Sequence, residues 1–364
     1  MGFDSFLGNA KAVQAIREML ARERVPGSLL FTGPEGVGKK TLAIMLARAL
    51  NCERRGPKGD DFCGECSRCR KAGEFLASGA EDLARRRGIK DAQKRVEGLV
   101  YFDLQVIEPL TRYILIEQIR QLRATAYSSP FNFPQRVLIV DQAQAIHWQA
   151  ADLLLKVLEE PPETTTIILV CSNAYELRPT IRSRCLTVQF SPAEETAIRR
   201  LLAEERGLAQ ADLELALRVV NGSIALAKTL QLKEYQELRK PWLNLLDAVS
   251  RPAGRPLSPP QWKALFDTTR LLAEGHGRLE ESLRTGSVVV RDLMHVFLNP
   301  ESPAVTNIDV LGRLKAWATA LGMAGIEKLE DGIESSYRQQ IRNVNQQLAF
   351  DSVAAELIGS GRRP

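Results

Sequence analysis

The sequence predicts an α/β protein whose first half is built on a parallel sheet and whose second half is helical. Before Phe190, short apolar runs alternate with segments of helix length. Such runs are typical of strands that are buried on both faces of a parallel sheet. After Phe190 the runs stop and helical patterning takes over. The chain has 364 residues, more than one hydrophobic core usually serves, so we expect two or three domains.

Four apolar runs are the predicted strands, and they are Leu29–Thr32, Val100–Ile107, Val137–Val140 and Ile167–Cys171. A helical region begins at Ser191-Pro192-Ala193-Glu194, which has the N-cap residue, N1 proline and N3 glutamate of a helix start. Residues 250–260 have the Pro, Gly and Ser density of a linker. The predicted parts are therefore a sheet domain over 1–190, a helical lid over 191–249, the linker, and a helical domain over 261–364.

The composition is that of an ordinary globular protein, with 45% hydrophobic and 26% charged residues. No apolar run approaches the ~18 residues that a membrane-spanning helix needs. Residues Met1–Asp4 have neither a basic nor an apolar signal region, so we expect a cytoplasmic location with reduced thiols. The 49 basic residues exceed the 44 acidic ones only slightly, which is compatible with nearby nucleic acid but does not establish a contact.

A glycine-rich segment, Gly33-Pro34-Glu35-Gly36-Val37-Gly38-Lys39, follows the first predicted strand and precedes the helical run Thr41–Leu50. This context is the one that a phosphate-binding P-loop requires. Backbone N–H groups and the helix N-terminus would surround a phosphate, and the lysine would reach the β- and γ-phosphates. The alternative is a tight turn without a ligand. The predicted nucleotide-binding residues of the loop are Gly33, Gly36, Val37, Gly38, Lys39, Lys40 and Thr41.

Two positions depart from the pattern of a P-loop that hydrolyses nucleotide. The residue after the loop lysine is normally Ser or Thr and holds Mg²⁺, but this chain has Lys40 there and its hydroxyl at Thr41, ~100° farther round the helix. The third strand ends in Asp141, which could still coordinate Mg²⁺ directly or through water. The next residue, Gln142, cannot act as a base. We therefore expect a site that can hold ATP or ADP, disfavours Mg²⁺, and hydrolyses slowly or not at all.

Four cysteines, Cys52, Cys63, Cys66 and Cys69, have the spacing C-x10-C-x2-C-x2-C. Four thiolates at this spacing predict a closed, tetrahedral and therefore structural Zn²⁺ site. Free or redox-active thiols are the alternative. The remaining cysteines, at 171 and 185, are predicted to be buried structural residues.

The segment Glu74–Gly98 is rich in Arg, Lys, Glu and Gly and includes the run Arg85–Arg87. We expect a solvated, mobile insertion here in preference to a DNA-binding patch. Near the end of the chain, a helix has an apolar face that fits a bundle core better than a partner surface. The residues of this face are Tyr337, Ile341, Val344 and Leu348.

Three segments resemble the bacterial clamp-loader family of AAA+ proteins in their order and spacing, namely Ile114–Ser129, Leu153–Pro162 and Pro179–Cys185. In that family the Ser-Arg-Cys element supplies an arginine finger to the ATP site of the adjacent subunit. The resemblance therefore implies that Arg184 acts in trans, where its permanent charge stabilises the γ-phosphoryl group during transfer. Without the surrounding motif, a surface or salt-bridged arginine would be the simpler interpretation of Arg184.

Two more positions match the family. Ser172 stands at the polar sensor-1 position, which faces the γ-phosphate or the attacking water. Asn221–Ala225 resembles the sensor-2 helix of motor subunits, but Ala225 stands where they carry arginine. A retained finger beside a degraded nucleotide site is similar to the delta-prime type of subunit and unlike the hydrolysing gamma/tau type.

The resemblance implies an AAA+/RecA-like P-loop sheet domain, a small helical lid and an all-α collar that assembles a pentameric ring. Asn343–Leu348 looks like the helix of that collar. The implied partners are gamma/tau and delta subunits, with the sliding clamp and primed DNA reached through the assembled complex, and no membrane. The implied role is to help load the clamp as part of DNA polymerase III, without a polymerase site in this chain. A gamma/tau-type motor ATPase and a nucleotide-free protein scaffold remain the alternatives.

Overall fold

The computed structural model describes residues 2–250, 257–273, 279–339 and 346–360. They divide into two compact units. The first extends to Ile198 and includes Gly222–Leu226, and the second consists of Arg199–Asn221 and the residues from Ala227 onward. Residues 251–256, most of the predicted linker, lie outside the described residues. Within the described ranges, no helix is both long and apolar enough to cross a lipid bilayer.

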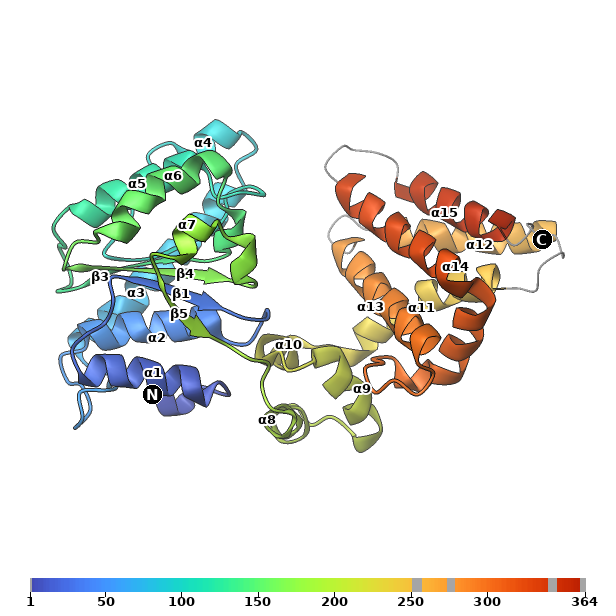
Figure 1. Ribbon diagram of the computed structural model, residues 1–364, viewed down its shortest axis with the longest axis horizontal. Helices are drawn as coiled ribbons and strands as arrows, with labels where there is room; N and C mark the ends of the chain where they lie inside the picture. The colour runs from blue at the N-terminus through green and yellow to red at the C-terminus, as the bar shows by residue number, and fades with distance from the viewer. Residues whose placement is uncertain (1, 251–256, 274–278, 340–345, 361–364) are drawn as a thin grey trace. The chain divides into compact units, whose positions relative to one another are not determined.

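The first unit is built on a five-stranded sheet in which every pairing is parallel (Figure 1). The strand order is β2-β3-β4-β1-β5. Every residue of β1, β3 and β4 is buried, which explains why these strands are continuous apolar runs. In chain order the elements up to the last strand are η1 (Phe3–Ser5), α1 (Ala10–Ala21), β1 (Ser28–Thr32), α2 (Lys39–Asn51), α3 (Ser67–Arg87), α4 (Ala92–Val96), β2 (Leu104–Ile107), α5 (Ile116–Tyr127), β3 (Arg136–Val140), η2 (Ala143–Ala145), α6 (Trp148–Glu159), β4 (Thr165–Cys171), η3 (Ala174–Glu176), α7 (Pro179–Arg182) and β5 (Leu186–Gln189).

Helices cover both faces of this sheet, with α1, α2 and α3 on one side and α5 and α6 on the other (Figure 1). Successive residues of the central strand serve the two cores in turn. Leu29 and Phe31 pack with α1–α3, whereas Leu30 packs with α5 and α6. The first unit is therefore a three-layer α/β fold of the AAA+ P-loop class, followed by helical structure, and the predicted fold class is confirmed.

Three elements differ most from the prediction. Strand β2 begins at Leu104 and not at Val100, and the edge strand β5 was not predicted. Three of the four residues of β5 are exposed, so the strand lacks an apolar run. The helix predicted from Ser191 begins at Glu195 instead. Its predicted first turn is extended because the Ser191 N–H donates to Asn9 Oδ1 at 2.7 Å and the Ala193 N–H donates to the Gly222 carbonyl at 2.9 Å.

The charged segment 74–98 is largely exposed, as expected of a solvated insertion, but it is mostly helical. Most of it belongs to the 21-residue helix α3 and the short helix α4. The Arg86 side chain is buried and donates from Nε to Asp82 at 2.6 Å and from Nη1 to the Arg95 carbonyl at 2.8 Å. A buried guanidinium needs this many partners, so its contacts hold the end of α3 against the following loop.

The second unit is all helical, and α11 to α15 enclose its core. Trp242 of α11 packs so closely on Gly286 of α13 that an added Cβ there would lie 2.4 Å from the indole ring. The elements after β5 are α8 (Glu195–Arg200), η4 (Leu201–Glu205), α9 (Gln210–Val220), α10 (Ile224–Thr229), α11 (Leu232–Val249), α12 (Pro259–Ala273), α13 (Leu279–Leu298), η5 (Ile308–Val310), α14 (Leu311–Gln339) and α15 (Gln346–Ser360).

The apolar face predicted near the end of the chain is not one continuous helix face. Tyr337 lies in α14, whereas Leu348 lies in α15 and is 63% exposed. Ile341 and Val344, and the first residues of the predicted collar helix, lie outside the described residues. Spacing alone could not show that the pattern spans two helices.

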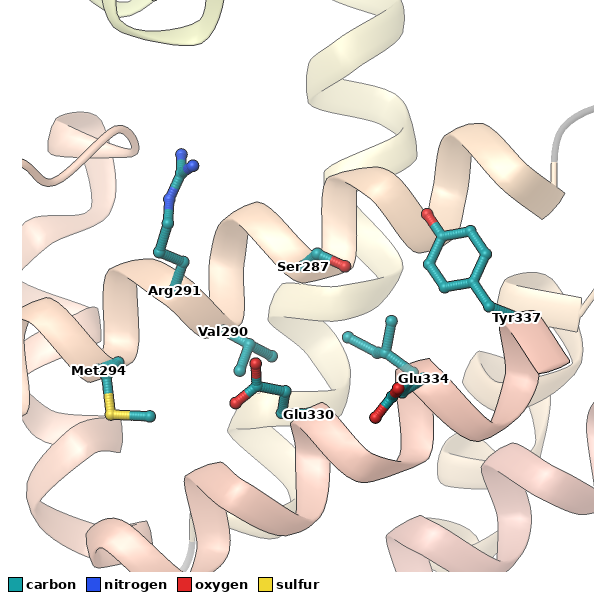
Figure 2. A pocket seen from close by; sticks show the side chains of 8 residues that line it. Ser287, Val290, Arg291, Met294, Glu330, Glu334 and Tyr337 are labelled. Carbon is teal, nitrogen blue, oxygen red and sulfur yellow. The ribbon is translucent and has the colours of Figure 1, made fainter. Parts of the chain in front are cut away.

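A cavity of about 300 Å³ lies between α13 and α14 of the second unit (Figure 2). Val290 and Arg291 line it from α13, and Glu330, Glu334 and Tyr337 line it from α14. None of the site residues predicted from the sequence lines this cavity.

A buried ion pair fixes the start of β2 and β3. Arg136 Nη2 lies 2.8 Å from Asp103 Oδ1, and both side chains are less than 5% exposed. Asp103 Oδ2 also accepts the N–H groups of Phe131 and Asn132 at 2.9 and 2.6 Å. We expect Asp103→Ala to lower the free energy of unfolding by about 3–5 kcal/mol, because it leaves the buried guanidinium unpaired. Urea unfolding measures this, and Asp152→Ala is the control.

Asp152 pairs with Arg178 at the surface, with side chains 64% and 45% exposed. Solvent screens such a pair, so its loss should change stability far less. Equal effects of the two substitutions would contradict the role given to the buried pair.

Candidate functional site

The candidate site lies along the edge at which the parallel strands of the first unit end. The P-loop follows β1, Glu108 follows β2, and Asp141 follows β3. Because these strands run parallel within one sheet, their carboxyl ends share an edge. The topology therefore brings together side chains that are far apart in the sequence.

The P-loop conformation depends on glycine, as Gly33 and Gly36 show. Gly33 has φ 143°, and an added Cβ would lie 2.2 Å from the Phe190 carbonyl oxygen. Gly36 has φ 75°, and an added Cβ would lie 1.9 Å from Ser223 Oγ. The loop ends at Gly38, the residue before the first turn of α2, and Val37 is buried beneath it. The predicted strand, loop and helix are thus present, with α2 beginning at Lys39.

Lys39 is turned toward its own loop. Its side chain is buried, and Nζ donates to the carbonyl oxygens of Gly33 and Pro34, each at 2.5 Å. Burial lowers the pKa of the Lys39 ammonium, against the opposing charges of Cys171, Asp141 and Glu35. The Lys39 ammonium, which in a P-loop contacts the phosphates, is therefore bound to the carbonyl groups of the loop itself.

Lys40 lies in a cluster of charges beyond the loop. Its Nζ forms an ion pair with Glu108 Oε1 and lies 3.6 Å from Asp141 Oδ2. Arg87, the last residue of α3, lies with Nη2 2.9 Å from Glu108 Oε2. Two cations thus face two carboxylates at the edge of the sheet. We call Lys40, Arg87, Glu108 and Asp141 the charge cluster.

The carboxylates of the charge cluster are affected differently by their surroundings. Burial raises the pKa of Asp141, although the Lys40 charge opposes it. For Glu108, burial would raise the pKa, but the hydrogen bond and charge of Lys40, together with Arg87, outweigh it and hold the pKa below its ordinary value. Glu108 is therefore the more firmly ionised partner and the main anchor of both cations.

The other predicted nucleotide-site residues surround this cluster without joining it. Thr41 is exposed. Gln142 is exposed in a left-handed conformation, with φ 53°, and its N–H donates to Asp141 Oδ1 at 3.0 Å. Ser172, directly after β4, accepts a hydrogen bond at 3.3 Å from the side chain of Gln144. No described contact pairs Asp141 with a hydroxyl group, which a hydrolysing P-loop supplies from the Ser or Thr after the loop lysine (the Walker pattern).

A short segment after α9 rests directly on the P-loop. The Ala225 N–H donates to the Gly36 carbonyl at 2.9 Å, and Ser223 Oγ fills the space beside Gly36. The Ala225 contact uses only the backbone, so it does not depend on the arginine that motor subunits of the resembled family carry at this position.

Arg184 lies at the surface between α7 and β5, and its side chain is 30% exposed. Its Nε donates to Glu159 Oε1 at 2.6 Å, and Nη1 donates to the Thr180 carbonyl at 2.8 Å. Glu159 is the last residue of α6 and is itself half-exposed. Exposed charge pairs of this kind are weak, so Arg184 can exchange Glu159 for another anion at little cost.

The four clustered cysteines meet at the end of α2 and the start of α3. Their sulfur atoms all lie within 4.8 Å of one another, with Cys52 Sγ 3.7 Å from Cys63 Sγ and 4.0 Å from Cys66 Sγ. Zn–S bonds of ~2.3 Å place tetrahedral sulfurs ~3.8 Å apart, so the donor set fits zinc. Backbone N–H groups lower the pKa of the Cys63 thiol to about 6, which favours its thiolate, whereas burial raises the pKa values of Cys52 and Cys69 in the absence of a metal.

The two remaining cysteines differ from this cluster. Burial raises the pKa of Cys171, and it raises the pKa of Cys185 to about 12. A thiol in such surroundings stays protonated and behaves as an apolar side chain. Cys171 is buried, as predicted, whereas Cys185 is only partly buried.

Sequence reasoning missed two members of the charge cluster, Glu108 and Arg87. Glu108 directly follows the predicted strand that ends at Ile107, just as Asp141 follows the next strand of the sheet. This equivalent position after a strand could have predicted that Glu108 belongs to the site. Nothing in the sequence predicts the position of Arg87, because a run of three arginines does not reveal which one faces the sheet.

Comparisons with known proteins point to one group. A family model described as DNA polymerase III, delta subunit matches residues 8–194. A DNA polymerase III subunit gamma/tau from Mycobacterium tuberculosis is 30% identical over 227 residues, which cover 61% of this chain and 35% of that protein. The tau subunit from Bacillus subtilis is 23% identical over 362 residues, covering 96% of this chain and 56% of that protein. The chain thus spans only part of the length of these relatives.

Among solved structures, a DNA polymerase III gamma subunit-related protein from Thermotoga maritima is similar with a TM-score of 0.48 and 18% identity. The match covers 96% of this chain and 100% of that one.

Proposed function

This chain belongs to the clamp-loader subunit family of DNA polymerase III, and we propose that within it the chain is a stator-like subunit of the delta-prime type. In this role it supplies Arg184 to the ATP site of a neighbouring subunit, while its own hydrolysis of ATP is slow or absent. The observation that carries the proposal is Lys40. Its ammonium stands where a hydrolysing P-loop has a hydroxyl, 3.6 Å from the carboxylate of Asp141.

Two further features support the proposal. Gln142, next to Asp141, has an amide that cannot accept a proton from water, so the position at which a hydrolysing enzyme has its base is occupied by a residue that cannot act as one. Arg184 is held only by partly exposed groups, and a guanidinium in that position is available to another chain. The partners in this role are gamma/tau and delta subunits, with the sliding clamp and primed DNA reached through the complex, and the cysteine cluster holds a structural Zn²⁺.

Two other functions have support of their own. The relatives compared above carry the names gamma/tau and tau, which favours a motor ATPase. The contact of Ala225 with Gly36 favours a nucleotide-free scaffold, in which the P-loop is a packed turn. A motor requires turnover by this chain, whereas a scaffold requires that no nucleotide binds.

ATPase assays of the chain alone and with gamma/tau and delta subunits separate the stator from the motor, and titration of the isolated chain with nucleotide identifies the scaffold. We expect no turnover above background for the isolated chain, because the charge cluster and Gln142 remove the metal ligand and the base. We expect the assembled complex to turn over ATP faster than gamma/tau with delta alone. Turnover by the isolated chain, abolished by Lys39→Ala, would establish the motor function instead. No stimulation in a verified complex would refute the stator function.

A further inference from the structure

The charge cluster has a composition that a magnesium site does not have. A P-loop Mg²⁺ takes oxygen ligands at 2.0–2.1 Å, one of them a Ser or Thr hydroxyl. The corresponding side chain here ends in an ammonium, which has three donors and no lone pair for a metal. Lys40 Nζ already contacts Glu108 and lies 3.6 Å from Asp141 Oδ2. The residues present therefore do not fit Mg²⁺.

The charges of the cluster also balance without a metal. Asp141 and Glu108 contribute two negative charges, and their side chains are only 18% and 11% exposed. Lys40 and Arg87 contribute two positive charges at ion-pairing distance. A divalent cation at Asp141 would lie a few ångströms from a fixed ammonium, and like charges so close repel strongly where water is partly excluded. The carboxylates have no unbalanced charge left to attract it.

The part of the loop that binds phosphate is preserved beside this cluster. The loop keeps its glycines, and the N-terminus of the 13-residue helix α2 opens at Gly38. The Lys39 ammonium lies at the same end, bonded only to loop carbonyls, and its partners Gly33 and Pro34 belong to the loop itself. A polyphosphate can therefore be bound by N–H groups, helix end and lysine while Lys40 supplies the neighbouring positive charge.

We propose that Lys40 is a built-in substitute for the metal ion, so that this P-loop takes a nucleoside polyphosphate as the free anion and not as its magnesium complex. The inference goes beyond the proposed function, because the role of Arg184 does not require that this loop binds phosphate. Arg87 has a definite part in it. By pairing with Glu108, it keeps the cluster neutral while Lys40 serves both carboxylates.

The test is calorimetric titration of the full chain with ADP, once in EDTA and once in excess Mg²⁺. We expect ADP to bind in EDTA, and Mg²⁺ to leave the affinity unchanged within about twofold or to weaken it, because Mg²⁺ in solution masks the free anion. Tightening by Mg²⁺ of about tenfold or more would overturn the inference. So would the absence of ADP binding at millimolar concentration.

Lys40→Ser provides the second arm, because it restores the hydroxyl of the Walker pattern beside Asp141. We expect this variant to bind ADP at least about tenfold more tightly in Mg²⁺ than in EDTA. Lys315→Ser is the matched control, since it removes a surface lysine paired with Glu301 at 2.6 Å in the second unit, and its ADP binding should equal that of the unaltered chain. A Lys40→Ser variant indifferent to Mg²⁺ would also overturn the inference.

The comparison in EDTA and Mg²⁺ with the unaltered chain stands even if Lys40→Ser does not fold. A result that overturns the inference about Lys40 would leave the proposed function untouched. The role of Arg184 in a neighbouring site needs no nucleotide in this chain, so it is decided by the ATPase of the complex alone.

Discussion

Replacing Arg184 with alanine should lower turnover on the order of 10³-fold at the single ATP site that this arginine completes in a reconstituted loader. A guanidinium that reaches the γ-phosphoryl group stabilises the charge that develops there, and alanine cannot. The fold of this chain should be unaffected, because the substitution removes only surface contacts with Glu159 and Thr180. Rapid measurement of phosphate release from the complex resolves the slowed site from the unaffected ones.

Two variants show whether the effect belongs to the finger. Arg178→Ala removes another surface arginine from the same region, which pairs with Asp152, and should leave phosphate release unchanged. Arg184→Lys keeps the charge without the planar fork, so we expect intermediate turnover. The trans role is refuted if Arg184→Ala releases phosphate at the normal rate in a complex shown to be assembled.

Zinc removal should have the largest effect on stability. We expect one Zn²⁺ per chain, and a structural zinc site of this kind contributes binding free energy on the order of 10 kcal/mol. Cys69→Ser should abolish the metal and lower the melting temperature, because it removes a buried ligand and leaves the buried thiols of Cys52 and Cys66 without a bridging ion. Metal analysis by mass spectrometry and thermal unfolding, with and without a chelator, measure both effects.

Cys185→Ser is the matched control for the zinc prediction. Cys185 is also partly buried, but the zinc-ligand geometry involves none of its atoms. This variant should retain the full zinc content. A chain purified without chelator that contains no zinc, or a Cys69→Ser variant that keeps it, would rule out the four-cysteine site.

The sequence predicted the strands that are covered by helices on both faces of the sheet. Strands β1, β3 and β4 are fully buried, so each contains an apolar run of strand length, and these runs alternate with segments of helix length. Strand β5 was not predicted because three of its four residues, Leu186 among them, are exposed at the sheet edge, so it has no apolar run. Helix α3 was not predicted because its polar composition resembles that of an irregular solvated segment, and its few buried residues, such as Ala72 and Arg86, leave little apolar periodicity.

The candidate site was predictable only in the part that is local in sequence. The P-loop and the four cysteines are closely spaced, so their geometry follows from a few residues. The charge cluster joins Arg87, Glu108 and Asp141 from three separate elements to Lys40. Its assembly depends on strand order, which hydrophobic patterning does not contain. The sequence therefore indicated that Lys40 removes a metal ligand, but not that the lysine is paired with the remaining carboxylates.

The pairing of Lys40 with Glu108 and Asp141 also affects how the charge at this site changes during the loading cycle. In a motor site, the metal ion binds and leaves with every nucleotide, so the charge beside the phosphates differs between the stages of the cycle. A lysine side chain belongs to the protein for its whole lifetime. If Lys40 replaces the metal, the electrostatics of this loop stay constant from one round of loading to the next. The charge at this site would then not change during the loading cycle, and only the ATP sites of the neighbouring subunits would change with each step.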